Sequence, residues 1–247
     1  MMELKHVEEL ALNQWPALSA LLYDGWLLRF AEGYTKRSNS VSPIFGSSLD
    51  TAAKIAACEE LYASQQQPAI FKITPFVQPE GLDQQLAERG YVRVDSSFIQ
   101  TLSLDQLQQP RLGGAVIRET LTANWLVDFC RLNPGSAAHR SVMEQIITRI
   151  IGKTGFISLV QDGRTVACGF GVIERGCIGL YDIVTDEACR NKGYAEQMIT
   201  HLLHWGKSNG AASSYLAVIA QNKPALRLYE KLGYKTAYEY WYRVRPN

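Results

Sequence analysis

The sequence predicts an α/β fold in which strands and helices alternate along most of the chain. Short runs rich in β-branched and aromatic residues, such as 69–73 and 177–185, are typical of strands. Longer segments with apolar residues at helical spacing, such as 49–65 and 193–209, are typical of amphipathic helices. A chain of 247 residues with 47% hydrophobic content can form one large domain or two small ones.

The elements follow in order from these patterns. Helices are predicted at 3–12, 16–22, 49–65, 79–89, 122–132, 137–151, 193–209 and 222–232. Strands are predicted at 25–31, 34–43, 69–73, as a pair within 92–104, and at 115–121, 155–160, 164–173, 177–185, 213–219 and 237–245. The stretch 105–114 is polar and contains Pro and Gly, which predicts a linker.

Composition excludes several classes of protein. A net charge of +1 gives no electrostatic footprint for a nucleic-acid backbone, so no nucleic-acid partner is expected. The N-terminus lacks the apolar run of a signal peptide, and no stretch is long and apolar enough to span a bilayer. The 5 cysteines form no Cys-x-x-Cys pair, which favours reduced thiols. We therefore expect a cytoplasmic protein without a membrane partner, as a monomer or homodimer.

Residues 190–195, Arg-Asn-Lys-Gly-Tyr-Ala, stand where a buried strand meets an amphipathic helix. Gly193 lets the backbone turn and lets a ligand approach without a Cβ in the way. Successive N–H groups at a helix N-terminus attract anions, and Arg190 and Lys192 add positive charge. This loop predicts a diphosphate site. The alternative with the same sequence pattern is an ordinary strand-to-helix turn with two solvated cations.

A second stretch, residues 221–234, contains a capping Asn222, then Pro224, Tyr229 and a terminating Gly233. Together with residues 190–195 it resembles the GNAT superfamily of acyl-CoA-dependent N-acyltransferases, over roughly 115–247. Ala195 in place of the commoner glycine, and Glu187 in place of a common proline, are modest departures. The resemblance implies a mixed, mostly antiparallel sheet flanked by helices, and acetyl-CoA as cosubstrate with no metal. It implies cofactor contacts from Ile183, Val184, Thr185, Arg190, Asn191, Lys192, Gly193, Tyr194, Ala195 and Asn222.

The resemblance also implies an acetyltransferase in which an acceptor amine attacks acetyl-CoA directly, in a ternary complex. Tyr229 matches the family's general acid, although a core aromatic is the plain alternative. Asp182 is the candidate general base, but strand alternation turns it away from a cleft lined by Ile183 and Thr185 unless a bulge intervenes. Water alone is the other option. Asn222 either contacts the cofactor or only caps its helix.

Other residues carry weaker signals. One ring among Tyr238, Tyr240 and Tyr242, and His139 in the 133–140 loop, are possible acceptor-side contacts by family position. His201 and His204 lie three residues apart but have no evident third ligand, so no metal site is expected. Cys189 is expected to be a bystander.

The first half of the chain repeats the second at an offset of 143, because "AERGYV" (87–92) corresponds to "EKLGYK" (230–235). We therefore expect a degenerate GNAT-like half at 1–104, a linker at 105–114 and a catalytic domain at 115–247. Leu86 then replaces Tyr229 and Asp50 replaces Gly193, so the first half should bind no acetyl-CoA. It is expected to buttress the catalytic half or to wall its acceptor cleft, with Tyr34, Lys36 and Arg37 as cleft candidates. The alternative is that the gapless alignment is wrong and that residues 1–104 form an unrelated domain. A non-catalytic acyl-CoA sensor on the same fold is the alternative function.

Overall fold

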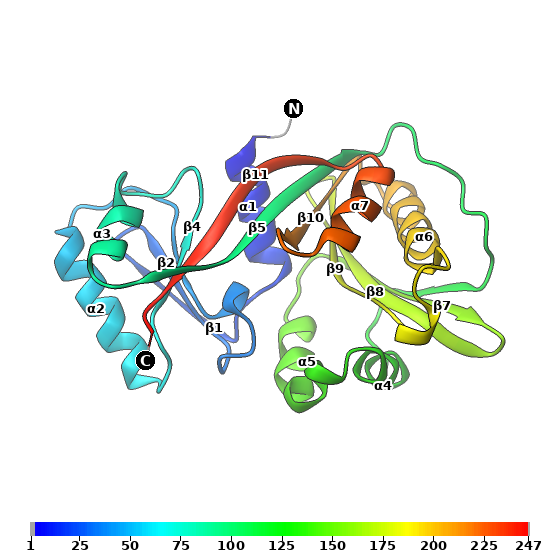
Figure 1. Ribbon diagram of the computed structural model, residues 1–247, viewed down its shortest axis with the longest axis horizontal. Coiled ribbons are helices and arrows are strands. Elements are labelled where there is room, and N and C mark those ends of the chain that lie inside the picture. The colour runs from blue at the N-terminus through cyan, green and yellow to red at the C-terminus, as the bar shows by residue number, and fades with distance from the viewer. Residues whose placement is uncertain (1–2, 247) are drawn as a thin grey trace.

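All eleven strands in residues 3–246, the part of the chain that the computed structural model describes, join in one open sheet (Figure 1). The strand order is β1-β2-β3-β4-β11-β5-β10-β9-β8-β7-β6. The strands are β1 (Ser19–Tyr23), β2 (Trp26–Phe30), β3 (Val41–Pro43), β4 (Ile70–Ile73), β5 (Val92–Ser103), β6 (Ala115–Arg118), β7 (Lys153–Gln161), β8 (Arg164–Glu174), β9 (Cys177–Thr185), β10 (Ser213–Ile219) and β11 (Lys235–Val244).

The helices alternate with these strands, as the sequence predicts. They are α1 (Leu4–Gln14), α2 (Thr51–Ser64), α3 (Leu82–Glu88), α4 (Ala123–Leu132), α5 (Arg140–Thr148), α6 (Tyr194–Ser208) and α7 (Lys223–Lys231), with 3₁₀ turns η1 (Lys36–Ser38), η2 (Pro134–His139) and η3 (Glu187–Cys189). No helix within residues 3–246 combines the length and the apolar character needed to cross a bilayer.

Four predicted elements are wrong. The strand predicted at 34–43 is confined to β3 at Val41–Pro43, because Lys36–Ser38 form the 3₁₀ turn η1. The segment 16–22 is no helix but leads into β1, which pairs with β2 through an Asp24-Gly25 turn, a strong hairpin signal that the short apolar run obscured. Residues 92–103 form one long strand instead of a pair, because Asp95, at a φ of 51°, bends β5 without ending it. The helix predicted at 137–151 begins at Arg140, after the η2 turn.

The two halves exchange their last strands. The C-terminal strand β11 lies between β4 and β5, and β5 lies between β11 and β10, so each half adds a strand to the sheet of the other (Figure 1). The β5–β11 ladder is symmetric under the offset of 143: it pairs Val92 with Val244, and Thr101 with Lys235. Ser97 faces Tyr240, which the offset relates to it, so a local two-fold axis passes beside this pair.

Three hydrophobic cores stabilise this arrangement. One lies under α2 and α3 in the N-terminal half, and one under α6 and α7 in the C-terminal half. The third packs α1, α4 and α5 against the other face of the sheet and includes residues of both halves, among them Trp15, Ile70, Phe170 and Tyr242. Because the halves share this core and the exchanged strands, they form a single structural unit.

Candidate active site

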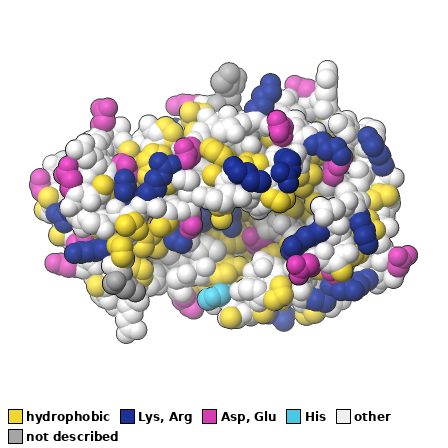
Figure 2. Space-filling view, in the orientation of Figure 1, with side chains coloured by type: hydrophobic (Ala, Val, Ile, Leu, Met, Phe, Trp, Pro, Cys, Tyr) yellow, Lys and Arg dark blue, Asp and Glu magenta, His cyan; other side chains and the backbone are white. Residues whose placement is uncertain are grey.

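A cleft opens where two parallel strands separate. β9 and β10 pair from Cys177–Ser213 to Leu180–Leu216 and no further. Beyond that point β9 pairs only with β8, and β10 only with β5. The resulting cavity of about 440 Å³ is lined by residues 180–183 of β9 and 216–219 of β10. Figure 2 shows this face of the molecule hollowed between the two halves.

A β-bulge causes the separation. Cys168 faces Val184 and Phe170 faces Tyr181, so the single Gly169 on β8 faces both Asp182 and Ile183. Asp182 has a φ of 50°. A Cβ at Gly169 would lie 2.6 Å from the Ile183 Cδ1 and 3.3 Å from both the Ile183 Cα and the Tyr181 carbonyl oxygen, so a glycine at this position leaves room for the bulge. This bulge is the one that the sequence left open, and it brings Asp182 into the cleft wall together with Tyr181 and Ile183.

Asp182 is a buried carboxyl with one charged partner. Its Oδ1 lies 3.7 Å from the Arg37 Nη2, and its Oδ2 is buried without a hydrogen-bond partner among the described residues. Burial raises the pKa of Asp182 above its ordinary value, and Arg37 opposes that rise. A carboxylate with a raised pKa and an unfilled bonding capacity is suited to accept a proton.

Tyr229 lies on α7 and lines the same cleft. Its side chain is 8% exposed, and its ring packs edge-on against Tyr234 with 5.9 Å between centroids. Burial raises the pKa of Tyr229 to about 12, so the hydroxyl keeps its proton at neutral pH. No described residue forms a hydrogen bond with this hydroxyl, which leaves it free to donate to a bound molecule.

Of the other predicted strand and helix residues, two line the cleft and two lie outside it. Ile183 and Asn222 line the cleft, and the Asn222 side chain also accepts a hydrogen bond from the Ala225 N–H at 3.2 Å, capping α7. Val184 packs instead against the core under α4, and Thr185 pairs with Ala167. Neither Val184 nor Thr185 lines the cavity, so any contact from them would be through the backbone.

The loop before α6 has the geometry of an anion site. Gly193 has a φ of 80°, and a Cβ built on it meets nothing within 4 Å. The backbone N–H groups of residues 191–196 donate no hydrogen bond to any other described residue. Arg190, Asn191 and Lys192 are exposed around them, and Tyr194 and Ala195 begin the helix. Such free N–H groups at a helix start fit a phosphate.

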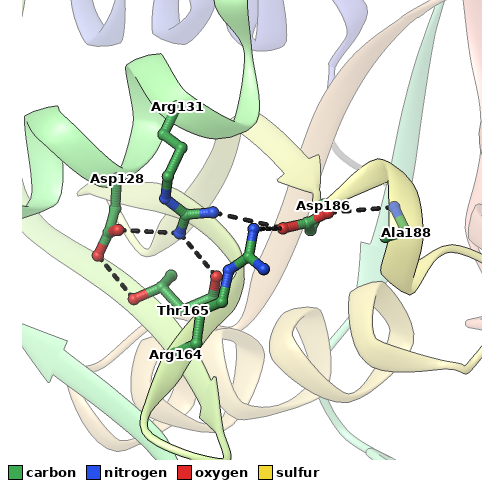
Figure 3. Close-up of polar contacts among 6 residues, drawn as sticks. All are labelled: Asp128, Arg131, Arg164, Thr165, Asp186 and Ala188. Carbon is green, nitrogen blue, oxygen red and sulfur yellow. Dashed lines mark hydrogen bonds and ion pairs between the residues drawn. The ribbon is translucent and has the colours of Figure 1, made fainter.

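A charged network, absent from the sequence predictions, fixes the start of this loop (Figure 3). Asp186 follows β9 and caps η3 by accepting the Ala188 N–H at 3.1 Å. Arg131 of α4 reaches Asp186 Oδ2 at 3.3 Å, and Arg164 reaches the same oxygen at 2.7 Å. Arg131 also donates to the Thr165 carbonyl at 2.8 Å. The loop is thus held to α4 and to the first residues of β8.

The N-terminal half and the exchanged strand β11 line the far side of the cleft. Tyr34, Thr35, Lys36 and Arg37 contribute to the wall from around η1, Asp95 and Ser97 from β5, and Tyr240 and Tyr242 from β11. Tyr238 does not line the cleft, because its hydroxyl donates to buried Glu8 at 2.8 Å. His139 also lies outside the lining but packs on Tyr34, with 5.3 Å between ring centroids.

Comparison with known proteins identifies the family. Residues 2–243 match the family described as "Probable histone acetyltransferase Rv0428c C-terminal". The chain belongs to this acetyltransferase family. It is 29% identical, over 98% of its length and 99% of the relative's, to the uncharacterized N-acetyltransferase YobR of Bacillus subtilis (strain 168).

Solved structures agree on the fold. A GCN5-related N-acetyltransferase from Kribbella flavida matches with a TM-score of 0.74 at 14% identity, covering 100% of this chain and 97% of the other. A tandem GNAT protein from the clavulanic acid biosynthesis pathway matches with a TM-score of 0.59 at 14% identity, covering 79% and 70%. The fold is that of a GNAT acetyltransferase with two GNAT-like halves.

In the N-terminal half of this GNAT acetyltransferase, the carboxylate of Asp24 occupies the position where the C-terminal half has free N–H groups. Under the offset of 143, Ser48 and Leu49 correspond to Asn191 and Lys192. The N–H groups of Ser48 and Leu49 donate to the carboxylate of Asp24, each at 3.0 Å. These bonds hold the pKa of Asp24 well below its usual range. The corresponding parallel strands β3 and β4 also do not separate into a cleft, because the Gln78 N–H after β4 donates to the Pro43 carbonyl of β3 at 2.8 Å.

The two helix histidines hold the connecting segment and are not arranged around a metal. His201 Nε2 lies 2.7 Å from the Leu112 carbonyl, and His204 Nε2 lies 2.9 Å from the Gln108 carbonyl. Gln197 accepts the Arg111 N–H at 2.6 Å. Segment 105–114 is therefore fastened along α6. Over residues 3–246, no group of three His, Cys, Asp or Glu side chains is placed to hold a metal ion.

Proposed function

We propose that this acetyltransferase moves the acetyl group of acetyl-CoA to a primary amine by direct attack in a ternary complex. One observation carries the proposal: the unbonded N–H groups of residues 191–196 lie at the end of the same strand that places Asp182 in a cleft with Tyr229. An anion site and a proton-transfer site therefore share one strand-to-helix unit.

The loop 190–195 would hold the diphosphate of the donor through backbone N–H groups, with Arg190 and Lys192 adding charge. Arg190 is engaged only weakly, 3.6 Å from the exposed Glu187 carboxylate. Asn222, on the cleft wall, would contact the pantetheine arm. Backbone groups of β9 beyond Leu180, from Ile183 to Thr185, have no partner on the β10 side and would face the thioester.

The roles of Asp182 as base and Tyr229 as acid are assigned from the protonation state of each side chain. Asp182 would take the proton from the acceptor ammonium or from the nitrogen as it forms the new C–N bond. Tyr229 would give its proton to the sulfur as the C–S bond breaks. The raised pKa of each group supports its role, because Asp182 holds a proton more tightly than an exposed aspartate and Tyr229 stays protonated until needed.

We also propose a division between the halves. Residues 115–247 would bind the donor, 105–114 would connect, and 1–104 would bind no donor but would form the acceptor wall through Tyr34, Lys36 and Arg37. The filled anion position at Asp24 supports the absence of a second donor site. The position of η1 in the cleft wall supports the acceptor role.

The test is acetyl-CoA incubated with a panel of primary amines, including small amines, amino acids and lysine peptides, read by release of free thiol. Acetylated product should appear with at least one amine and should be confirmed by mass. A reaction without amine corrects for hydrolysis. Tight acetyl-CoA binding without thiol release across the panel would contradict catalysis and would favour a sensor.

A further inference from the structure

Arg37 meets Asp182 across the junction between the two halves. Arg37 lies in η1, whose backbone is fixed when buried Arg29 donates to the Arg37 carbonyl at 2.7 Å. The guanidinium of Arg37 lies over the ring of Trp15, at 4.5 Å from its centroid, and 5.8 Å from the ring centroid of Tyr181. These aromatic faces hold the cation beside the bulge of β9.

The separation between Arg37 and Asp182 is informative. At 3.7 Å the Nη2–Oδ1 pair is an ion pair but is longer than a normal N–H···O hydrogen bond. Arg37 therefore acts on Asp182 through its charge, without filling an acceptor position on the carboxylate. The lone pairs of Oδ1 stay free to receive a proton from a bound amine.

Arg37 is the one cation that forms an ion pair with Asp182 in residues 3–246. Asp182 in turn raises the pKa of Tyr34 beside η1 and of Cys168 on β8, and both groups are neutral at physiological pH. Tyr181 on β9, which precedes Asp182 and faces Arg37, has a pKa raised by burial and is neutral as well. Tyr240 and Tyr242 of β11 both interact with Arg37, and burial raises the pKa of Tyr242 well above its ordinary value, so that Tyr242 is neutral there. Lys36, the neighbour of Arg37, is engaged elsewhere, 2.8 Å from Asp95.

We propose that Arg37 is a positioning residue, supplied by the half that binds no donor, which keeps Asp182 ionised and oriented to act as the general base. The inference rests on the proposed function, in which Asp182 is that base. It gives the degenerate half a part in the chemistry beyond walling the cleft. Loss of Arg37 would leave a buried carboxylate with no compensating charge, and Asp182 would hold its proton at higher pH.

The direct test is titration of Asp182 by ¹³C NMR of the full-length chain labelled at aspartate carboxyls, without substrate. The Asp182 signal is the one missing from Asp182→Asn. In Arg37→Met the pKa of Asp182 should rise by about 1 to 3, the usual effect of an opposite charge at this range. Arg37→Lys should retain part of the effect, because it keeps the charge. Lys36→Met, in the same turn, is the matched control and should leave the pKa of Asp182 unmoved.

The activity readout is the pH profile of turnover with an amine accepted by the wild type. In Arg37→Met the acid limb should move to higher pH, with turnover recovering as pH rises, which a merely structural lesion would not show. An unchanged Asp182 pKa in Arg37→Met, or an equal shift in Lys36→Met, would overturn the proposal. If Arg37→Met does not fold, Arg37→Lys decides: a pKa of Asp182 that rises by less than full loss of charge predicts supports the role of charge, and a rise as large as full loss of charge predicts contradicts it. Failure of the wild type to acetylate any amine would instead contradict the proposed function, while the NMR titration still tests the pair.

Discussion

Replacing Tyr229 with Phe separates catalysis from packing. The substitution keeps the buried ring and its edge-on contact with Tyr234, and removes only the hydroxyl. No described residue forms a hydrogen bond with that hydroxyl, so no intramolecular hydrogen bond is lost. The free energy of unfolding should therefore change by less than about 0.5 kcal/mol.

Turnover should respond very differently. Loss of acid–base assistance typically slows a reaction by roughly 10²–10⁴. At about 1.36 kcal/mol per factor of ten, that corresponds to a barrier raised by about 2.7–5.4 kcal/mol. Acetyl-CoA affinity should change little, because the diphosphate loop at residues 190–195 is untouched.

Tyr234→Phe is the matched control. Tyr234 is equally buried on the neighbouring turn, but its hydroxyl bonds to the Ser214 Oγ at 2.7 Å, and it does not line the cleft. Its loss leaves a buried serine hydroxyl unpaired and should lower the free energy of unfolding by about 1–2 kcal/mol. Turnover should stay near the wild-type value.

The assay pairs thiol release at saturating substrates with chemical denaturation of each variant. The expected pattern is crossed: Tyr229→Phe is slow and stable, whereas Tyr234→Phe is active and less stable. An unaltered rate in Tyr229→Phe, under conditions where chemistry limits turnover, would refute the role of its hydroxyl and leave Tyr229 as a packing residue.

Three further expectations concern the donor site and pH. Gly193→Asp should abolish acetyl-CoA binding, because an L residue is strained at a φ of 80° and a carboxylate would repel the diphosphate; calorimetry with unchanged affinity in a folded variant would contradict this. Titration should give one acetyl-CoA per chain, because Asp24 occupies the corresponding N–H groups of the first half; two per chain would show a second donor site. Turnover should fall as pH drops through the raised pKa of Asp182, but should show no alkaline loss from Tyr229 near the ordinary tyrosine pKa of about 10, because its pKa is raised to about 12. An alkaline limb abolished by Tyr229→Phe would count against that assignment.

The donor loop and most elements could be predicted from local sequence because local physics determines them. A glycine at positive φ, a helix start and a capping asparagine each depend on a few neighbouring residues, and the structure has them at Gly193, Tyr194 and Asn222. The same locality explains the errors. The unbroken β5 depends on its partner strands, and the short apolar run before the Asp24-Gly25 turn does not show by itself whether it will pair or coil.

The repeat at an offset of 143 was also visible in the sequence, since related halves keep their element order. The exchange of β5 and β11 was not, because either half could have kept its own last strand without changing its hydrophobic pattern. Strand order is decided by which edges meet, and that is a property of the assembled sheet.

The acid–base site required the tertiary structure most of all. The sequence did not decide which way the Asp182 side chain points. Regular strand alternation would turn it away from the cleft, and a bulge would turn it toward the cleft. The bulge exists because Gly169, on another strand, leaves room for it. Arg37 reaches Asp182 from 145 positions earlier in the chain, held by Trp15 and Arg29, so only the folded sheet could bring that charge to the cleft.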